Sequence, residues 1–271
     1  MRKVINPVRH ISFLILLLGY QAVYAQKEIY RHRVFWTKTE INQVYPNKFG
    51  WGADLVLRRK NELGQGTMFD QPLRESFRPW VHYQFSPGAR FSFSPIGYMH
   101  TNEYKALEAD FNRDNYHEWR TTFQFFHHQK QLNGKIMHTW RYRYELRWQE
   151  QQNAEDYRFF TRLRFRYRLR YVFKGDNFYE NNMMYAAISN ELGINIGNNV
   201  PYNFNQSRWY LGAGIRFANA ARIELRYVDR YRARGSLGNI YDRGQGLMIG
   251  LYIDQLSEIG KKKVQEVRFY D

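Results

Sequence analysis

The feature that most constrains this chain is a strict two-residue alternation that runs from Tyr157 to Phe173. Odd-numbered positions in this segment are apolar or aromatic apart from Thr161, whereas most even-numbered positions are basic. The basic set is Arg158, Arg162, Arg164, Arg166, Arg168 and Arg170. A helix would mix the two sets around its surface, but a strand places them on opposite faces. The segment therefore predicts one long strand with an apolar face and an arginine face.

The same alternation recurs along the chain and predicts an all-β protein. The clear segments are 33–44, 50–60, 76–86, 89–100, 116–130, 134–149, 157–173, 183–195, 205–217, 222–227 and 246–254. Because single-chain bacterial barrels have even strand numbers, we expect one further strand, from 27–33 or from 264–270. We therefore predict a single antiparallel transmembrane β-barrel of about 12 strands, within a range of roughly 10 to 12.

The connections between the predicted strands differ in length in a regular way. Short connections at 45–49, 87–88, 131–133 and 218–220 alternate with long ones near 61–75, 101–115, 196–204 and 231–245. Outer-membrane barrels have this pattern, with short periplasmic turns and longer outer loops. Pro79 and Pro95 fall inside strand segments, where the ring nitrogen donates no ladder hydrogen bond, and they predict a bend or a strand end.

Strand length and composition favour a membrane barrel over a soluble β-sandwich. The mean hydropathy of −0.70 excludes a helical membrane bundle but not a barrel, in which only alternate residues face lipid. A strand over 157–173 would span roughly 55 Å, far more than a typical soluble strand. The chain contains 22 Tyr, 20 Phe and 7 Trp. Trp near predicted strand ends is typical of interfacial girdles, and the tryptophans placed there are Trp36, Trp51, Trp119, Trp148 and Trp209.

The first 25 residues have the three parts of a secretory signal peptide. Arg2, Lys3 and Arg9 are positive, residues 11–18 are apolar, and Ala25 ends a plausible cleavage site. The apolar run is too short to cross roughly 30 Å of hydrocarbon as a helix. We therefore predict that 1–25 is cleaved and that 26–271 is the barrel domain. The predicted location is the outer membrane of a Gram-negative bacterium, with outer-membrane lipid, lipopolysaccharide and the insertion machinery as partners.

Several motifs in the chain resemble those of one family. They are Ser76–Trp80 (SFRPW), His82–Pro87 (HYQFSP), Phe91–Pro95 (FSFSP), Asn190-Glu191 and Phe204–Gly212 (FNQSRWYLG). In their order and spacing, across about 30–254, they resemble the uncharacterised DUF2490 family, which is found mostly in Bacteroidetes. The resemblance implies an outer-membrane β-barrel of unknown function and supplies no catalytic residue.

The arginine faces are the main candidate site, in a chain with 41 Lys and Arg against 25 Asp and Glu. In a membrane barrel the polar faces of the strands line the lumen. The arginines placed there are Arg141, Arg143, Arg147, Arg158, Arg162, Arg164, Arg166, Arg168, Arg170, Arg208, Arg216, Arg222 and Arg226. Their potential predicts a narrow, porin-like, anion-favouring pore, or a barrel that binds small anionic solutes. The alternative is a packed structural or interaction barrel whose arginines pair with Glu118, Glu145, Glu191 and Glu224.

Other classes of function have less support in the sequence. A lipid-modifying enzyme of the outer membrane would need a His and a Ser on the barrel wall, for which His127, His138 and Ser189 are candidates. No GxSxG, HExxH or P-loop motif is present, so we predict no enzymatic activity and no cofactor. The acids of the 101–115 connection match no EF-hand spacing, so no metal site is predicted. Basic, aromatic β-proteins also bind nucleic acid, but the signal peptide argues against that partner.

Overall fold

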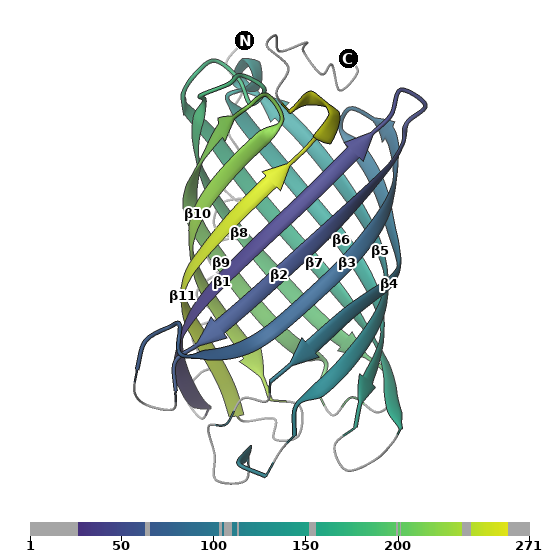
Figure 1. Cartoon of the computed structure of the whole chain (residues 1–271), viewed down its shortest axis with the longest axis vertical. Coiled ribbons are helices and arrows are strands. Elements are labelled where there is room, and N and C mark those ends of the chain that lie inside the picture. Colours follow the sequence, from purple (N-terminus) through teal and green to yellow (C-terminus); the bar gives the residue numbers. More distant parts are fainter. Residues whose placement is uncertain are drawn as a thin grey trace, which may run out of the picture.

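The computed structural model describes residues 27–62, 66–102, 105, 110–112, 114–151, 156–198, 200, 202–234 and 240–259. They form one closed barrel of eleven tilted strands (Figure 1). The strands are β1 (Glu28–Val44), β2 (Phe49–Lys60), β3 (Gln71–Ser86), β4 (Ala89–Thr101), β5 (Tyr116–Gln131), β6 (Ile136–Glu150), β7 (Tyr157–Lys174), β8 (Met184–Ile196), β9 (Phe204–Phe217), β10 (Ala221–Ala233) and β11 (Ile240–Ile253). The predicted signal peptide at 1–25 lies outside the described residues.

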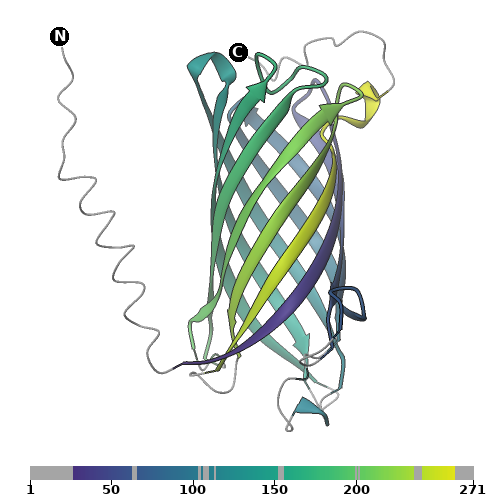
Figure 2. The ribbon, with the colours of Figure 1, turned by 90° about the vertical axis from the view of Figure 1, so that its left-hand side faces the viewer.

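The barrel closes through a parallel ladder between β1 and β11, which runs from Glu28↔Ile240 to Ile41↔Ile253. Figure 2 shows these two strands side by side, β1 in purple and β11 in yellow. Every other pair of sequential strands among the described residues is antiparallel. An up-and-down chain with an odd number of strands begins and ends in the same direction, so its first and last strands can only meet in parallel.

The eleven segments predicted from the alternation correspond to β1 to β11. The expected count of about 12 is not confirmed among the described residues. Residues 28–33 extend β1 and make no separate strand, and 264–270 lies outside the described residues. The expectation of an even number assumed antiparallel closure, and the parallel β1–β11 ladder removes that requirement.

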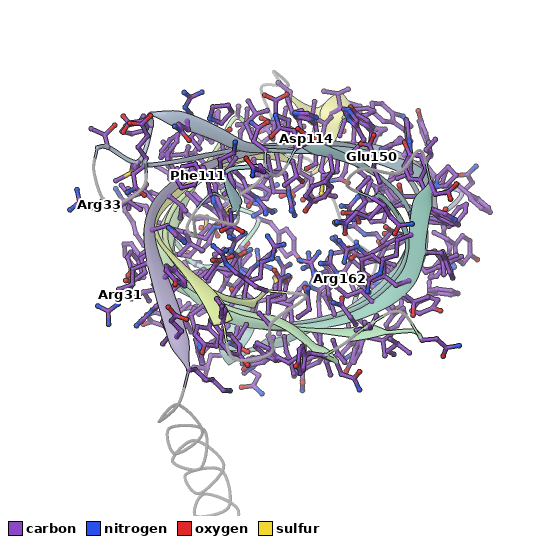
Figure 3. All side chains as sticks on the ribbon, turned by 90° about the horizontal axis from the view of Figure 1, so that it is seen from below. Arg31, Arg33, Phe111, Asp114, Glu150 and Arg162 are labelled. Atoms are coloured by element: carbon purple, nitrogen blue, oxygen red, sulfur yellow. The ribbon has the colours of Figure 1, made fainter. Side chains whose placement is uncertain are left out.

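Each strand presents one set of side chains to the inside of the barrel and the other set to the outside. On β7, Leu163 and Phe165 are exposed, whereas Arg162 and Arg164 are buried. In the end-on view of Figure 3, Arg31 points away from the barrel and Arg162 points into it. The wall is therefore apolar outside and polar inside, which is the reverse of a soluble barrel.

The connections fall into two groups at opposite ends of the barrel. One end, the short-turn end, has connections at 45–48, 87–88, 132–135 and 218–220, together with the longer 175–183. The other, the long-loop end, has connections at 61–70, 102–115, 151–156, 197–203 and 234–239. In the three-residue hairpin at 218–220, Ala218 and Asn219 have φ of 46° and 59°, the left-handed backbone that also occurs in the turns favoured by β-hairpins.

Both prolines interrupt the ladder without ending a strand. The β3–β4 register shifts between Phe77 and Val81, around Pro79, and the β4–β5 register shifts between Ser94 and Gly97, around Pro95. The predicted bends are thus confirmed as irregularities inside continuous strands. None of the described helices is long and apolar enough to cross a membrane.

Candidate functional site

A cavity of about 610 Å³ lies inside the barrel. Its lining includes Pro87 and Gly88 of the β3–β4 turn and Tyr179 of the β7–β8 connection, so it reaches the short-turn end. Among the described residues, its basic side chains are Lys38, Arg58, Arg90, Lys130, Arg141, Arg143, Arg164, Arg166, Arg168, Arg170, Arg208, Arg216, Arg222 and Arg226. Its acidic side chains are Glu40, Asp54, Glu191 and Asp254. The formal charge of the lining is therefore strongly positive.

The predicted arginines divide between this cavity and the interior nearer the long-loop end. Ten of the thirteen line the cavity, and only Arg147, Arg158 and Arg162 do not. Of the four predicted glutamates, Glu191 alone lines it. The structure therefore brings most of the predicted arginines together around the cavity, whereas Glu118, Glu145 and Glu224 lie outside its lining and pair with arginines at its edges.

A dense ion-pair network fills part of the long-loop half. Glu118 of β5 is fully buried and binds Arg120 and Arg147, with the Arg147 Nη2 to Glu118 Oε2 distance 2.8 Å. Glu145 of β6 is also fully buried, and its Oε2 lies 2.5 Å from Arg162 Nη2. Neither glutamate lines the cavity. The carboxylates of Glu118 and Glu145 are thus each held by several guanidinium groups, and we name this set the Glu118–Glu145 network.

Arg164 links this network to the centre of the barrel. Its Nη1 lies 3.1 Å from Glu145 Oε1, and its Nη2 binds Glu191. Glu191 also binds Arg141 and lies 3.2 Å from Arg208 Nη1. One carboxylate therefore joins strands β6, β7 and β9 at the inner edge of the cavity.

A second group of ion pairs lies near the short-turn end. Glu224 Oε1 lies 2.7 Å from both Arg168 Nη2 and Arg222 Nη1, and it accepts a hydrogen bond from the Tyr185 hydroxyl. Asp254, which follows β11, lies 3.0 Å from Arg222 Nη2. Burial alone would raise the pKa of Asp254, but Arg222 and Arg216 outweigh it, so the pKa is lower than its ordinary value.

Four cavity-lining arginines have no carboxylate partner among the described residues: Arg58, Arg90, Arg166 and Arg170. In each the Nε atom is buried without a hydrogen-bond acceptor. Arg90 instead lies over the Phe126 ring at 5.0 Å and Arg170 over the Phe178 ring at 5.1 Å. A buried guanidinium without an acceptor is costly, so these groups are available to an anion that enters the cavity.

Trp36 of β1 is the centre of a further group of donors. Its ring is 1% exposed and lies beneath Arg58, Arg208 and Arg230, with ring-to-Cζ distances of 4.3, 5.6 and 5.7 Å. The Trp36 Nε1 and the Nε atoms of all three arginines have no acceptor. Donors without acceptors converge here at the inner side of the cavity, since Trp36, Arg58 and Arg208 line it.

Sequence reasoning missed Arg58, Arg90 and Arg230. It was wrong in placing Trp36 in the interfacial girdle, because Trp36 is buried and lines the cavity inside the barrel. The signal was present for two of them, because Arg58 alternates with Leu55 and Leu57, and Arg90 alternates with Phe91 and Phe93. Strands β2 and β4 carry few arginines, so their polar faces stand out less in the sequence than the polar face of β7. The arrangement around Trp36 had no such signal, since it depends on strands β1, β2, β9 and β10 meeting inside the closed barrel.

The residues considered for a hydrolase do not come together. His127 is exposed and packs on Trp140, and His138 Nδ1 lies 2.7 Å from the Tyr167 hydroxyl. Ser189 is buried and shares the inward parity of Glu191 on β8. These histidines and the serine therefore lie on opposite faces of the barrel wall.

A comparison with protein families identifies the family of this chain. The model described as a protein of unknown function, DUF2490, matches residues 34–239. The chain belongs to the DUF2490 family. The matched span begins in β1 and ends in the β10–β11 connection of this DUF2490 barrel, so it covers most of the strands that line the cavity. A search of curated proteins finds no match.

Proposed function

We propose that this DUF2490 protein is an outer-membrane β-barrel that binds a small anionic solute in an arginine-lined lumen open toward the short-turn end. The proposal includes export by the signal peptide and insertion by the outer-membrane machinery. It includes no enzymatic step, cofactor or nucleic-acid partner.

The outer surface supports a membrane location. Large apolar side chains are exposed around the wall, for example Leu211 at 59%, Leu225 at 54% and Phe77 at 50%. Leu211 and Leu225 lie on the neighbouring strands β9 and β10, and Phe77 lies on β3 at another part of the circumference. Such a belt would be unfavourable in water and matches the lipid-facing band of a transmembrane barrel. Outer-membrane lipid and lipopolysaccharide are therefore its expected surroundings.

The single observation that carries the binding proposal is the imbalance of charge in the cavity. Fourteen basic and four acidic described side chains line it, and Arg58, Arg90, Arg166 and Arg170 lack a carboxylate partner. Within low-dielectric walls such a group concentrates anions. Guanidinium groups also match the oxygens of carboxylates and phosphates in a bidentate geometry. The solute class that fits is a small carboxylate or phosphate compound.

A binding barrel is favoured over an open pore by the network in the long-loop half. Glu118 and Glu145 hold arginines that would otherwise project freely, and their carboxylates are 0% exposed. We infer that this network narrows the path to the long-loop end, so that an anion entering from the short-turn end is retained.

Binding is tested by the thermal unfolding of the refolded barrel in detergent, followed by heat-modifiable electrophoretic migration. Inorganic pyrophosphate should raise the unfolding temperature more than sodium chloride of the same ionic strength, because a ligand that binds only the folded state stabilises it. Arg166→Gln should reduce this effect, and Arg31→Gln, which removes an outward-facing charge, should leave it unchanged. Equal stabilisation by both salts would contradict the proposal.

The second candidate function is a packed structural barrel, favoured by the full pairing of Glu118, Glu145, Glu191 and Glu224. A porin-like pore is the third candidate function, and conductance in planar bilayers distinguishes it from a binding barrel and from a structural barrel. A binding barrel should insert without steady conductance and respond to pyrophosphate. A structural barrel should be silent and unresponsive, whereas a pore should give a steady, anion-selective current.

A further inference from the structure

Two histidines face each other on the outer wall near the long-loop end. His100 of β4 and His117 of β5 are register partners, and their Nδ1 atoms lie 3.3 Å apart. Both side chains are half-buried. The pair lies on the opposite face of the wall from the arginine cavity and plays no part in the proposed anion binding.

The hydrogen bonds of His100 fix which ring nitrogen carries its hydrogen. Its Nε2 lies 3.0 Å from Asn102 Oδ1, and the amide is oriented because Asn102 Nδ2 donates to the Pro72 carbonyl oxygen at 3.0 Å. An amide oxygen only accepts, so His100 Nε2 is the donor. In the neutral ring the Nδ1 atom then presents a lone pair to His117.

His117 can present a lone pair at the same point. Its Nδ1 lies 2.6 Å from the Tyr98 hydroxyl, which can donate to it. Its Nε2 has no partner among the described contacts and can carry the ring hydrogen. The Glu150 carboxylate accepts a hydrogen bond from the His117 backbone N–H at 2.8 Å and adds negative charge beside the pair. Two nitrogen lone pairs and a phenol oxygen therefore converge, with a carboxylate beside them.

We propose that His100 and His117 bind a divalent transition-metal ion of the zinc class on the outer wall. Two nitrogens that each lie about 2.0 to 2.1 Å from a tetrahedral zinc ion are roughly 3.3 Å apart, which matches the observed separation. Tyr98 is the nearest further ligand. If it binds as a phenolate, its proton is released to solvent. Water completes the coordination, so the ion is exchangeable.

No group of three or more His, Cys, Asp or Glu among the described residues could hold a metal ion, so the proposed site rests on the two histidines and Tyr98. The two histidines are separated by the whole β4–β5 connection, and only the strand register pairs them. Asn102 acts as a positioning residue, since its hydrogen bond selects the His100 tautomer that leaves Nδ1 free.

The test is calorimetric titration of zinc chloride into the refolded full-length barrel in detergent, after heat-modifiable migration has shown that each variant is folded. Wild type should bind one zinc ion per barrel. His100→Ala and His117→Ala should each weaken binding at least about tenfold, since even outer-shell partners contribute about 10- to 100-fold. Asn102→Ala should weaken it less, and His127→Ala, which removes an exposed histidine at the other end, should not change it.

A second readout uses Cu²⁺, which prefers the same imidazole ligands. Its electron paramagnetic resonance spectrum should show coupling to two nitrogens in wild type and to one in His117→Gln. The absence of saturable zinc binding would mean that a proton on His117 Nδ1 holds the two rings together, and the proposal would be wrong. Zinc binding that persists in the double variant H100A/H117A would overturn it as well.

Discussion

Two groups of arginines in the barrel interior, those of the Glu118–Glu145 network and those without a described carboxylate partner, use the same residue type in opposite ways. In the long-loop half, Arg147 and Arg162 bind fully buried glutamates. Toward the short-turn end, Arg90 and Arg170 lie over aromatic rings and have no described carboxylate partner. Strand β7 contributes to both groups through one continuous polar face. What differs is the supply of carboxylates from neighbouring strands, and this supply decides whether an arginine is structural or available to a ligand.

The two groups of arginines also contribute differently to the free energy of unfolding. A buried carboxylate held by two or three guanidinium groups leaves several uncompensated charges when it is removed, and the loss of one partner of a buried pair costs about 3–5 kcal/mol. Removing an arginine that has no partner relieves a desolvation cost instead. Stability should therefore depend on the Glu118–Glu145 network, and anion affinity on the cavity.

The largest expected effect is that of Glu145→Gln. It removes the charge that holds Arg162 and Arg164, and it should lower the free energy of unfolding by about 3–5 kcal/mol. The measurement is urea unfolding of the barrel in lipid vesicles. Glu75→Gln makes the same chemical change at an exposed position of β3 and should have little effect. Equal effects of the two substitutions would remove the distinction between the two groups of arginines.

The next largest effect on stability is expected from one of two matched substitutions on β7. Arg162→Gln leaves Glu145 with fewer partners and should destabilise the barrel by at least about 2 kcal/mol. Arg166→Gln, on the same face, breaks no described ion pair and should change stability by less than about 1 kcal/mol. Urea midpoints measured side by side check this order, and a larger loss for Arg166→Gln would reverse the assignment of the two positions.

A smaller effect concerns acid pH at the short-turn end. The pKa of Asp254 is lower in the folded state than its ordinary value of 3.8, because Arg222 and Arg216 outweigh the effect of burial. Its ion pairs therefore stabilise the fold fully above that ordinary value, and the contribution is lost as pH falls through the folded pKa.

Between about pH 5 and about pH 2, wild type should lose about 1 kcal/mol more stability than Asp254→Asn, the scale of a partly exposed pair. The pH dependence of the urea midpoint measures this difference. Asp176→Asn, at an exposed position of the β7–β8 connection, should follow the wild-type curve. If Asp254→Asn also follows it, Asp254 does not stabilise the mouth of the cavity through Arg222.

Local alternation was enough to predict the strands, because a period of two appears within each segment and needs no knowledge of its neighbours. It also predicted which side of each strand carries the arginines. The alternation could not predict which strands meet to close the barrel. The parallel β1–β11 ladder joins residues near the two ends of the described chain, and the expected even count came from a rule for other barrels.

The ion pairs inside the barrel could not be predicted from the alternation within single strands either, because they also depend on how the barrel closes. Arg141 of β6 binds Glu191 of β8, and Arg168 of β7 binds Glu224 of β10. Both pairs reach past at least one intervening strand, so they depend on the diameter and tilt of the closed barrel. The sequence could name the glutamates as partners, but it could not show that Glu118 and Glu145 lie outside the cavity.

The most direct test of the division between the two groups of arginines is calorimetric titration of citrate into the refolded barrel at constant ionic strength. The account predicts saturable binding with one citrate per barrel in wild type. Arg166→Gln combined with Arg170→Gln should weaken that binding at least about tenfold, the loss of about 1.4 kcal/mol or more, while Arg31→Gln leaves it unchanged. Folded wild-type protein that binds no citrate, or a double variant that binds it as tightly as wild type, would contradict the claim that the unpaired arginines form a site for anions.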